Sequence, residues 1–133
     1  MIKNFIVFSI FCLTFSYADF IGLTPSQLDE KIKEHTVVID IRTPGEWTQT
    51  GVIPSSKKIM FFEPNGNYNT QSWLDEFSKH IKDQNEPFIL VCRSGNRTST
   101  VGNFLSKQLK FKNVYHLENG INSWLKENRS TQK

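Results

Sequence analysis

The sequence predicts an α/β fold with a parallel sheet covered by helices on both faces. Short apolar runs rich in β-branched residues alternate along the chain with longer stretches of helical spacing. Such alternation is typical of strand–helix–strand units, whose strands are parallel. The run at 88–91 (Phe-Ile-Leu-Val) is apolar at every position, which indicates a strand buried on both faces.

The first predicted elements are a helix and a strand. Thr24, Pro25 and Gln27 fit the N-cap, N1 and N3 positions of a helix. Residues 36–41 are β-branched and nearly all apolar, which predicts a strand covered on both faces. The Thr-Pro-Gly-Glu sequence at 43–46 then predicts a turn.

The middle of the chain repeats this alternation. Residues 58–62 are a second apolar run and predict another strand. A loop is expected at 64–67, where Pro, Asn and Gly gather, and large apolar residues at helical spacing predict a helix over 72–81. After the strand at 88–91, apolar residues recur on one helical face over 101–109.

The chain ends with a strand at 113–117, an Asn-Gly turn at 119–120 and a helix marked by apolar residues within 121–125. The polar tail from Lys126 onward is expected to fray. We find no internal repeat, linker or low-complexity segment, so one domain is expected over 19–133.

The first eighteen residues have the form of a secretory signal peptide. Lys3 supplies a positive charge, residues 5–15 are almost all apolar, and small residues stand at the two ends of 16–18. The apolar run is shorter than the roughly 20 residues that a spanning helix needs. We therefore expect cleavage after residue 18, a periplasmic or secreted protein, and no membrane attachment after signal cleavage.

The charge and cysteine content narrow the function classes. A formal net charge of +3 at pH 7 gives no reason to expect nucleic acid as a partner. Signal cleavage would remove Cys12 and leave Cys92 as the single thiol, which indicates a reactive site or an intermolecular bridge. His35, His80 and His116 lack metal-ligand spacing, so no zinc site is expected.

The loop at 92–98 (Cys-Arg-Ser-Gly-Asn-Arg-Thr) carries the chemistry. It places Cys92 at the carboxyl end of a strand and the amino end of a helix, where free backbone N–H groups and the helix dipole favour negative charge. With Arg93 and Arg97 nearby, the thiol is expected to ionise easily and to act as a nucleophile. That role also requires the sulfur to be open to solvent.

Three reactions are compatible with this loop. In sulfur transfer, Cys92 attacks a donor such as thiosulfate, keeps one sulfur as a persulfide, and passes it to an acceptor, with arginines binding the anions. Cysteine phosphatases also set a thiolate under a loop closed by arginine, but they have one residue more between Cys and Arg than the four here. Disulfide chemistry needs a resolving cysteine, which the mature chain lacks.

Sulfur transfer is favoured among these, and a non-catalytic persulfide carrier is its main alternative. The non-functional alternative is a buried cysteine that serves only as a small apolar residue of the core. The Arg-Ser-Gly-Asn-Arg sequence that follows Cys92 argues against it, because such neighbours are uncommon around a core thiol.

Four segments, in order, resemble motifs of the rhodanese family of single-domain sulfurtransferases. The matches are 92–98 with C-R-x-G-x-R-[ST], 40–47 with D-x-R-x-x-x-E-aromatic, 51–54 with G-H-I-P, and 117–124 with L-x-G-G-x-x-x-W. Together they cover about residues 20–125, and the exported single-domain form resembles the phage-shock protein E type of periplasmic rhodanese. The chain departs from the usual pattern in one loop and strand edge, at Val52, Ser55, Ser56 and Lys58, and Asn119 replaces a glycine of the late segment.

The resemblance implies a roughly five-stranded parallel sheet, thiosulfate sulfurtransferase activity through a persulfide on Cys92, and no metal or organic cofactor. It implies a small anionic sulfur donor, a thiol or cyanide as acceptor, and possibly a protein as sulfur acceptor. The substrate-binding residues it implies are Arg93, Ser94, Gly95, Asn96, Arg97 and Thr98.

Residues outside the loop are secondary candidates. Asp40 and Arg42 are possible members of the site, although an ion pair between Arg42 and Glu46 that fixes the turn is the simpler expectation. Phe61 or Phe62 is a candidate for the rim of the pocket.

Overall fold

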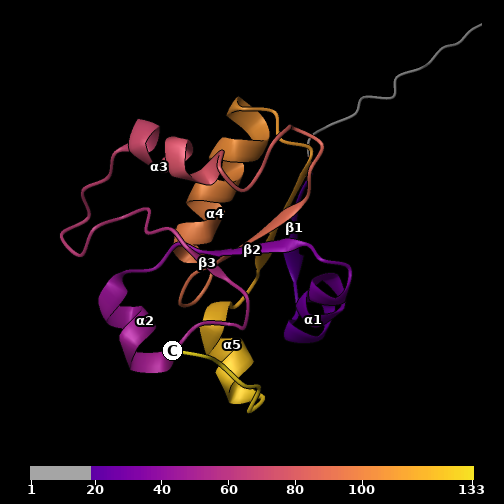
Figure 1. Cartoon of the computed structure of the whole chain (residues 1–133), viewed down its shortest axis with the longest axis vertical. Coiled ribbons are helices and arrows are strands. Elements are labelled where there is room, and N and C mark those ends of the chain that lie inside the picture. Colours follow the sequence, from indigo (N-terminus) through magenta and orange to yellow (C-terminus); the bar gives the residue numbers. More distant parts are fainter. Residues whose placement is uncertain (1–18) are drawn as a thin grey trace, which may run out of the picture.

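The structure is a computed structural model that describes residues 19–133, so the predicted signal peptide and Cys12 lie outside the described residues. Figure 1 shows the arrangement of the elements. In chain order they are β1 (Asp19–Leu23), α1 (Pro25–Lys33), β2 (Val37–Asp40), α2 (Pro44–Thr50), β3 (Lys57–Lys58), α3 (Thr70–Phe77), β4 (Phe88–Val91), α4 (Asn96–Asn103), the π-helix η1 (Phe104–Gln108), β5 (Asn113–Leu117) and α5 (Gly120–Lys126).

The strands form one five-stranded sheet in the order β1-β5-β4-β2-β3, and every neighbouring pair is parallel. β4 occupies the centre, and all four of its residues are buried. Helices α3 and α4 lie on one face of the sheet, and α1 and α5 lie on the other (Figure 1). The predicted fold class, with its parallel sheet and helices on both faces, is confirmed.

Each face of the sheet has its own apolar core. On the α3 and α4 face, rings pack edge to face or stacked, including Trp73 on Phe77 and Phe77 on Phe88. On the opposite face, α1 contributes Leu28 and α5 contributes Trp124. Burial of this kind yields about 25 cal/mol per Å² of apolar surface, so the two cores hold the central strand rigidly beneath the loop that follows it.

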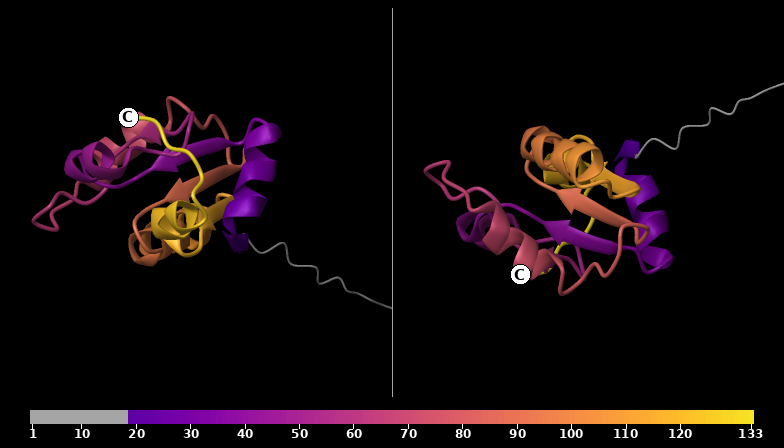
Figure 2. Two further views of the ribbon diagram at one scale, coloured as in Figure 1. Left: turned by 90° about the horizontal axis from the view of Figure 1, so that it is seen from below. Right: turned by 90° about the horizontal axis from the view of Figure 1, so that it is seen from above.

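The strand order creates a crevice between β2 and β4. After β2 the chain moves outward to β3 at one edge, whereas after β4 it moves the opposite way to β5. The two connections therefore diverge above neighbouring carboxyl ends, which is where open α/β sheets bind ligands. The loop between β3 and α3 projects from the body in all views and stands beside this end of the sheet (Figures 1 and 2).

Three element predictions were wrong in detail. No element was predicted for residues 19–23, which form the edge strand β1. This strand is short, contains a glycine and pairs with one neighbour only, so its sequence gives a weak strand signal. Residues 44–50 continue past the predicted turn as α2, because Thr43 and Glu46 form a capping box. Of the predicted strand at 58–62, only the first residue joins β3.

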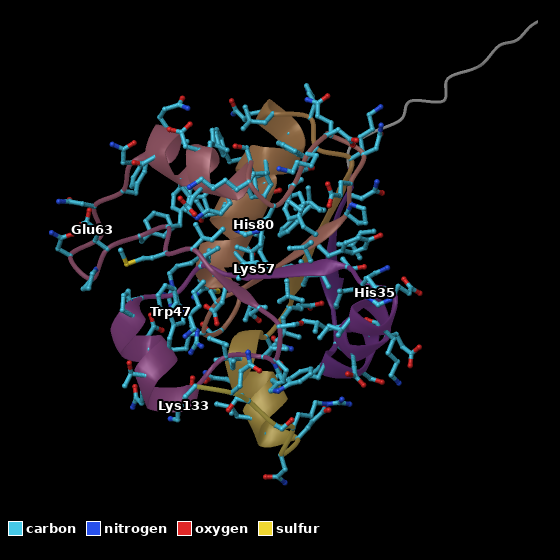
Figure 3. All side chains as sticks on the ribbon, viewed as in Figure 1. His35, Trp47, Lys57, Glu63, His80 and Lys133 are labelled. Atoms are coloured by element: carbon cyan, nitrogen blue, oxygen red, sulfur yellow. The ribbon has the colours of Figure 1, made fainter. Side chains whose placement is uncertain are left out.

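The carboxyl-terminal tail is docked, so the expectation that it frays was also wrong. Val52 and Gln132 form an antiparallel bridge, and the Trp124 indole donates to the Ser130 carbonyl at 2.8 Å. Lys133 lies next to α2 (Figure 3), where its ammonium donates to the Thr48 carbonyl. Within residues 19–133, no helix has the length and apolar character needed to cross a bilayer.

Candidate active site

Cys92 follows β4 directly, and its sulfur lies in a cradle of N–H groups. The backbone N–H of Gly95 donates to Sγ at 3.2 Å, and that of Thr98 donates at 3.4 Å. The Thr98 hydroxyl lies at 3.4 Å from the same sulfur. These donors come from the loop and the first turn of α4, so the inward-facing amides expected from the sequence are present at an anion-favouring helix start.

The cradle is shaped by two interlocked loops. Gly95 has φ of 103°, and a Cβ there would collide with the Glu118 carbonyl oxygen. Gly120 has φ of 65°, and a Cβ there would collide with the Arg93 carbonyl. The N–H of Asn122 donates to that carbonyl at 3.1 Å, so the loops after β4 and β5 contact backbone to backbone. Only glycine allows such an approach.

The expected solvent access of Cys92 was wrong. The residue is 1% exposed, and its sulfur lies beneath the loop rather than on the surface. The loop whose N–H groups point at Sγ also covers that atom, so the same packing that supplies the hydrogen bonds removes the sulfur from solvent. Any reactant would therefore have to reach the sulfur through a local opening of the loop.

Arg97 is held by a carboxylate from α2. Its two terminal nitrogens donate to the two oxygens of Glu46, each at 2.8 Å. Hydrogen bonds from Arg97, then from Thr43, outweigh the effect of burial and lower the pKa of Glu46 from 4.5 to about 2, while Glu46 raises the pKa of Arg97. The expected pair between Arg42 and Glu46 was wrong, because Arg97 reaches this carboxylate instead.

Arg42 and Asp40 form a buried pair beneath α2. Arg42 donates from Nε and Nη2 to the Asp40 carboxylate at 2.9 to 3.1 Å, and from Nη1 and Nη2 to Thr50 and the Gly51 carbonyl. Asp40 also accepts from the Trp47 indole at 3.1 Å. These contacts tie the end of β2 to the middle and the carboxyl end of α2, so the pair fixes the position of the helix that carries Glu46.

A cleft of about 760 Å³ lies beside the cysteine loop. Its lining includes Arg93, Asn96 and Arg97 from the cysteine loop and α4, Glu46 from α2, and residues 62–64 and 66 from the loop after β3. Figure 3 shows Glu63 on that projecting loop and Trp47 on α2. A second cleft of about 360 Å³ lies on the other side of Arg93.

The remaining predicted residues divide into exposed and buried groups. Arg93, Ser94 and Asn96 are exposed, whereas Gly95 and Thr98 are buried. Within residues 19–133, the Arg93 guanidinium has no hydrogen bond or ion pair, so its charge is available to an anion entering the cleft. Phe62 lines this cleft, as expected for one of the two rim candidates, and Phe61 belongs to the core.

A family model described as a rhodanese-like domain matches residues 24–127. The chain belongs to the rhodanese family. The interlocked loops around Cys92 are the two segments, 92–98 and 117–124, whose sequences resemble rhodanese motifs, and the fold brings them into contact.

Relatives of this rhodanese are distant. An uncharacterised protein of Rickettsia prowazekii is 28% identical over 93 residues, which cover 68% of this chain and 72% of that protein. A rhodanese-related protein of Thermoplasma volcanium is 29% identical, with a TM-score of 0.61 over 82% of this chain and 94% of that one. The polysulfide-sulfur transferase homodimer of Wolinella succinogenes shares the fold, at 23% identity and a TM-score of 0.62, over 86% of this chain and 79% of that one.

Two partners in the site were missed from the sequence. Glu46 was assigned to Arg42, and no local pattern connects it with Arg97. His116 was dismissed as isolated, yet its Nδ1 lies 2.7 Å from the Thr98 hydroxyl. The alternation of side chains along β5 could have indicated this contact. Residues 114 and 116 point to the same face of the sheet, and Val114 belongs to the core on the α4 side. Among residues 19–133, no three His, Cys, Asp or Glu side chains gather as a metal site.

Proposed function

We propose that this rhodanese is a sulfurtransferase that carries sulfane sulfur as a persulfide on Cys92, taking it from thiosulfate and giving it to cyanide or a thiol. The observation that supports this proposal is the sulfur itself, which accepts two backbone N–H groups at 3.2 and 3.4 Å. Donors aimed at Sγ stabilise the thiolate that attacks the sulfur donor and that is regenerated when the outer sulfur leaves.

The reaction has two displacement steps. In the first, the Cys92 thiolate attacks the outer sulfur of thiosulfate, a new S–S bond forms, and sulfite leaves with the electron pair of the broken bond. In the second, cyanide or a thiolate attacks the terminal sulfur, and thiocyanate or a new persulfide leaves as Cys92 regains its thiolate. Sulfur and charge balance over the cycle without an oxidant or reductant.

The two loop arginines have different parts in this proposal. Arg93 lies at the junction of the two clefts with its charge unpaired among the described side chains, so it attracts the anionic donor. Arg97 is bound by Glu46, so it acts mainly by fixing the loop against α2. This arrangement also disfavours a phosphatase, whose loop arginine must turn inward to hold a phosphate.

Intact mass spectrometry tests the central step. Treatment with thiosulfate is expected to add one sulfur atom to the protein, and a thiol is expected to remove it. Cys92→Ser should take up no sulfur while keeping the circular dichroism spectrum and urea midpoint of the wild type. Uptake by a folded Cys92→Ser protein would show that the persulfide forms elsewhere and would refute the assigned nucleophile.

Steady-state assays separate an enzyme from its alternatives. Continuous release of thiocyanate from thiosulfate and cyanide is expected, whereas a carrier would transfer one sulfur per chain and stop. Hydrolysis of an aryl phosphate at a comparable rate would favour a phosphatase instead.

Removal of a charge from the donor site has a matched control. Arg93→Gln is expected to raise KM for thiosulfate about tenfold with little change in kcat, because a hydrogen bond from a cation contributes roughly 1.5 kcal/mol. Lys107→Gln removes the same charge from an exposed position on η1, away from both clefts, and is expected to behave as wild type. Equal effects of the two substitutions would show that Arg93 acts only through net charge.

We also propose that the protein works after export, as a periplasmic rhodanese of the phage-shock protein E type. The pattern of residues 1–18 supports this, with its charged start, apolar run and small residues. Protein purified from the periplasm is expected to begin at Asp19. Recovery of uncleaved protein from the cytoplasm alone would contradict export.

A further inference from the structure

A chain of hydrogen-bonding groups leads from the active sulfur into the sheet. The Thr98 hydroxyl lies 3.4 Å from Cys92 Sγ and 2.7 Å from His116 Nδ1. The three residues are 0 to 6% exposed and come from the end of β4, from α4 and from β5. Direct transfer of the thiol proton to bulk water is therefore blocked, and His116 is the titratable group at the inner end of this chain.

The single hydroxyl proton of Thr98 couples Cys92 to His116. Its oxygen is also 3.2 Å from the Gly95 carbonyl, so three neighbours compete for one proton. When Nδ1 of His116 carries no proton, the hydroxyl donates to it, and the sulfur can only donate S–H to the hydroxyl oxygen. When Nδ1 carries a proton, the imidazole donates to that oxygen, and the hydroxyl proton is free to point at a thiolate.

The surroundings keep the imidazole neutral before the thiol gives up its proton. His116 is paired in register with Leu90 of β4 and Gly22 of β1, and its ring packs on Phe20 with centroids 4.5 Å apart. Burial lowers the pKa of His116, and the negative charge of Glu118 opposes this effect. Glycine, leucine and phenylalanine carry no charge, so Glu118 is the charged residue that acts on the ring from its own and the neighbouring strands.

We propose, building on the persulfide chemistry above, that His116 is a positioning residue that receives the Cys92 proton through the Thr98 hydroxyl. The S–H bond breaks and its proton bonds to the hydroxyl oxygen, while the original hydroxyl proton passes to Nδ1. The electron pair stays on sulfur, so a thiol and a neutral imidazole become a thiolate and an imidazolium. Every donor of the cradle then points at the sulfur.

This arrangement predicts a linked titration of Cys92 and His116. The thiolate is followed by its ultraviolet absorbance, and the imidazole by the NMR signals of its ring protons, both in the whole protein without donor or acceptor. His116→Asn keeps a hydrogen-bonding group beside Thr98 but cannot take up a proton. At a pH where the wild-type thiol is partly ionised, we expect about tenfold less thiolate in this variant.

Variants of the bridge separate the relay from packing. Thr98→Val keeps the shape without the hydroxyl and is expected to lose thiolate as His116→Asn does, whereas Thr98→Ser keeps the hydroxyl and is expected to titrate as wild type. His80→Asn is the matched histidine control and is expected to leave the Cys92 titration unchanged. An unchanged titration in both His116→Asn and Thr98→Val would overturn the relay.

A measurement on the unaltered histidine guards against variants that do not fold. The NMR midpoint of His116 is expected to move when Cys92→Ser replaces the thiol, and an unmoved midpoint would also overturn the proposal. Because these titrations need no substrate, they are independent of sulfur transfer. Turnover with uncoupled titrations would remove the relay alone, and coupled titrations without turnover would remove the proposed sulfurtransferase function alone.

Discussion

Glu46→Gln tests whether the ion pair behind the active loop stabilises the fold. The pair joins α2 to α4, with two N–H donors of Arg97 each 2.8 Å from a carboxylate oxygen. Glutamine has the same shape and still serves at the N3 position of a capping box, so the cap on Thr43 survives the substitution. The change therefore removes the charge and one of the two acceptors of Arg97, and it leaves the helix cap in place.

The pKa of Glu46 sets the size of the effect. Its fall from 4.5 in an ordinary setting to about 2 corresponds to roughly 3.4 kcal/mol at about 1.36 kcal/mol for each unit. The side chains of Glu46 and Arg97 are 24% and 27% exposed, so solvent screens part of this energy. We expect Glu46→Gln to lower the free energy of unfolding by about 1.5 kcal/mol at neutral pH.

The pH dependence has a definite sign. Because the folded pKa of Glu46 is depressed, its contribution is fully present above 4.5 and is lost as pH falls toward about 2. Urea unfolding of the wild type and of Glu46→Gln is to be measured across this range. The two stabilities are expected to differ most near neutrality and to converge in acid.

A surface ion pair supplies the control for this experiment. Glu76, in the last turn of α3, and Lys79, just beyond that helix, are 2.9 Å apart, with more than half of each side chain exposed. Glu76→Gln is expected to cost less than about 0.5 kcal/mol. A constant difference between wild type and Glu46→Gln from neutral pH into acid, or an effect no larger than that of Glu76→Gln, would refute the reasoning.

Two further substitutions and one alkylation reaction test other features of the site. Arg42→Met leaves the Asp40 carboxylate buried without its cation and is expected to cost about 3–5 kcal/mol in urea unfolding, and a cost below about 1 kcal/mol would contradict a bracing role. Gly95→Ala forces a Cβ into the Glu118 carbonyl and is expected to abolish persulfide formation by intact mass, so normal sulfur uptake would contradict the interlocked loops. Alkylation of Cys92 by a bulky maleimide is expected to be at least about tenfold slower than in urea-unfolded protein, because the loop must open first, and equal rates would contradict its burial.

Local patterns in the sequence were sufficient for most of the scaffold. The apolar run at 88–91, the helix start at Thr24 and the loop that begins at Cys92 were all predicted where the structure has them. Each depends on periodicity, capping or turn chemistry within a few residues, so the neighbouring residues alone carry the information. The motifs at the two glycine loops likewise indicated the rhodanese family before any geometry was known.

Contacts between distant segments were decided by the tertiary structure. Arg97 and Glu46 are 51 residues apart, and Thr98 and His116 are 18 apart, so nothing local selects one partner over another. The burial of Cys92 has the same origin, because the loop closes only when the strand order brings the β5 turn against it. Sequence alone therefore singled out Cys92 and the loop that follows it, and the packing of parallel strands determined which groups surround its sulfur.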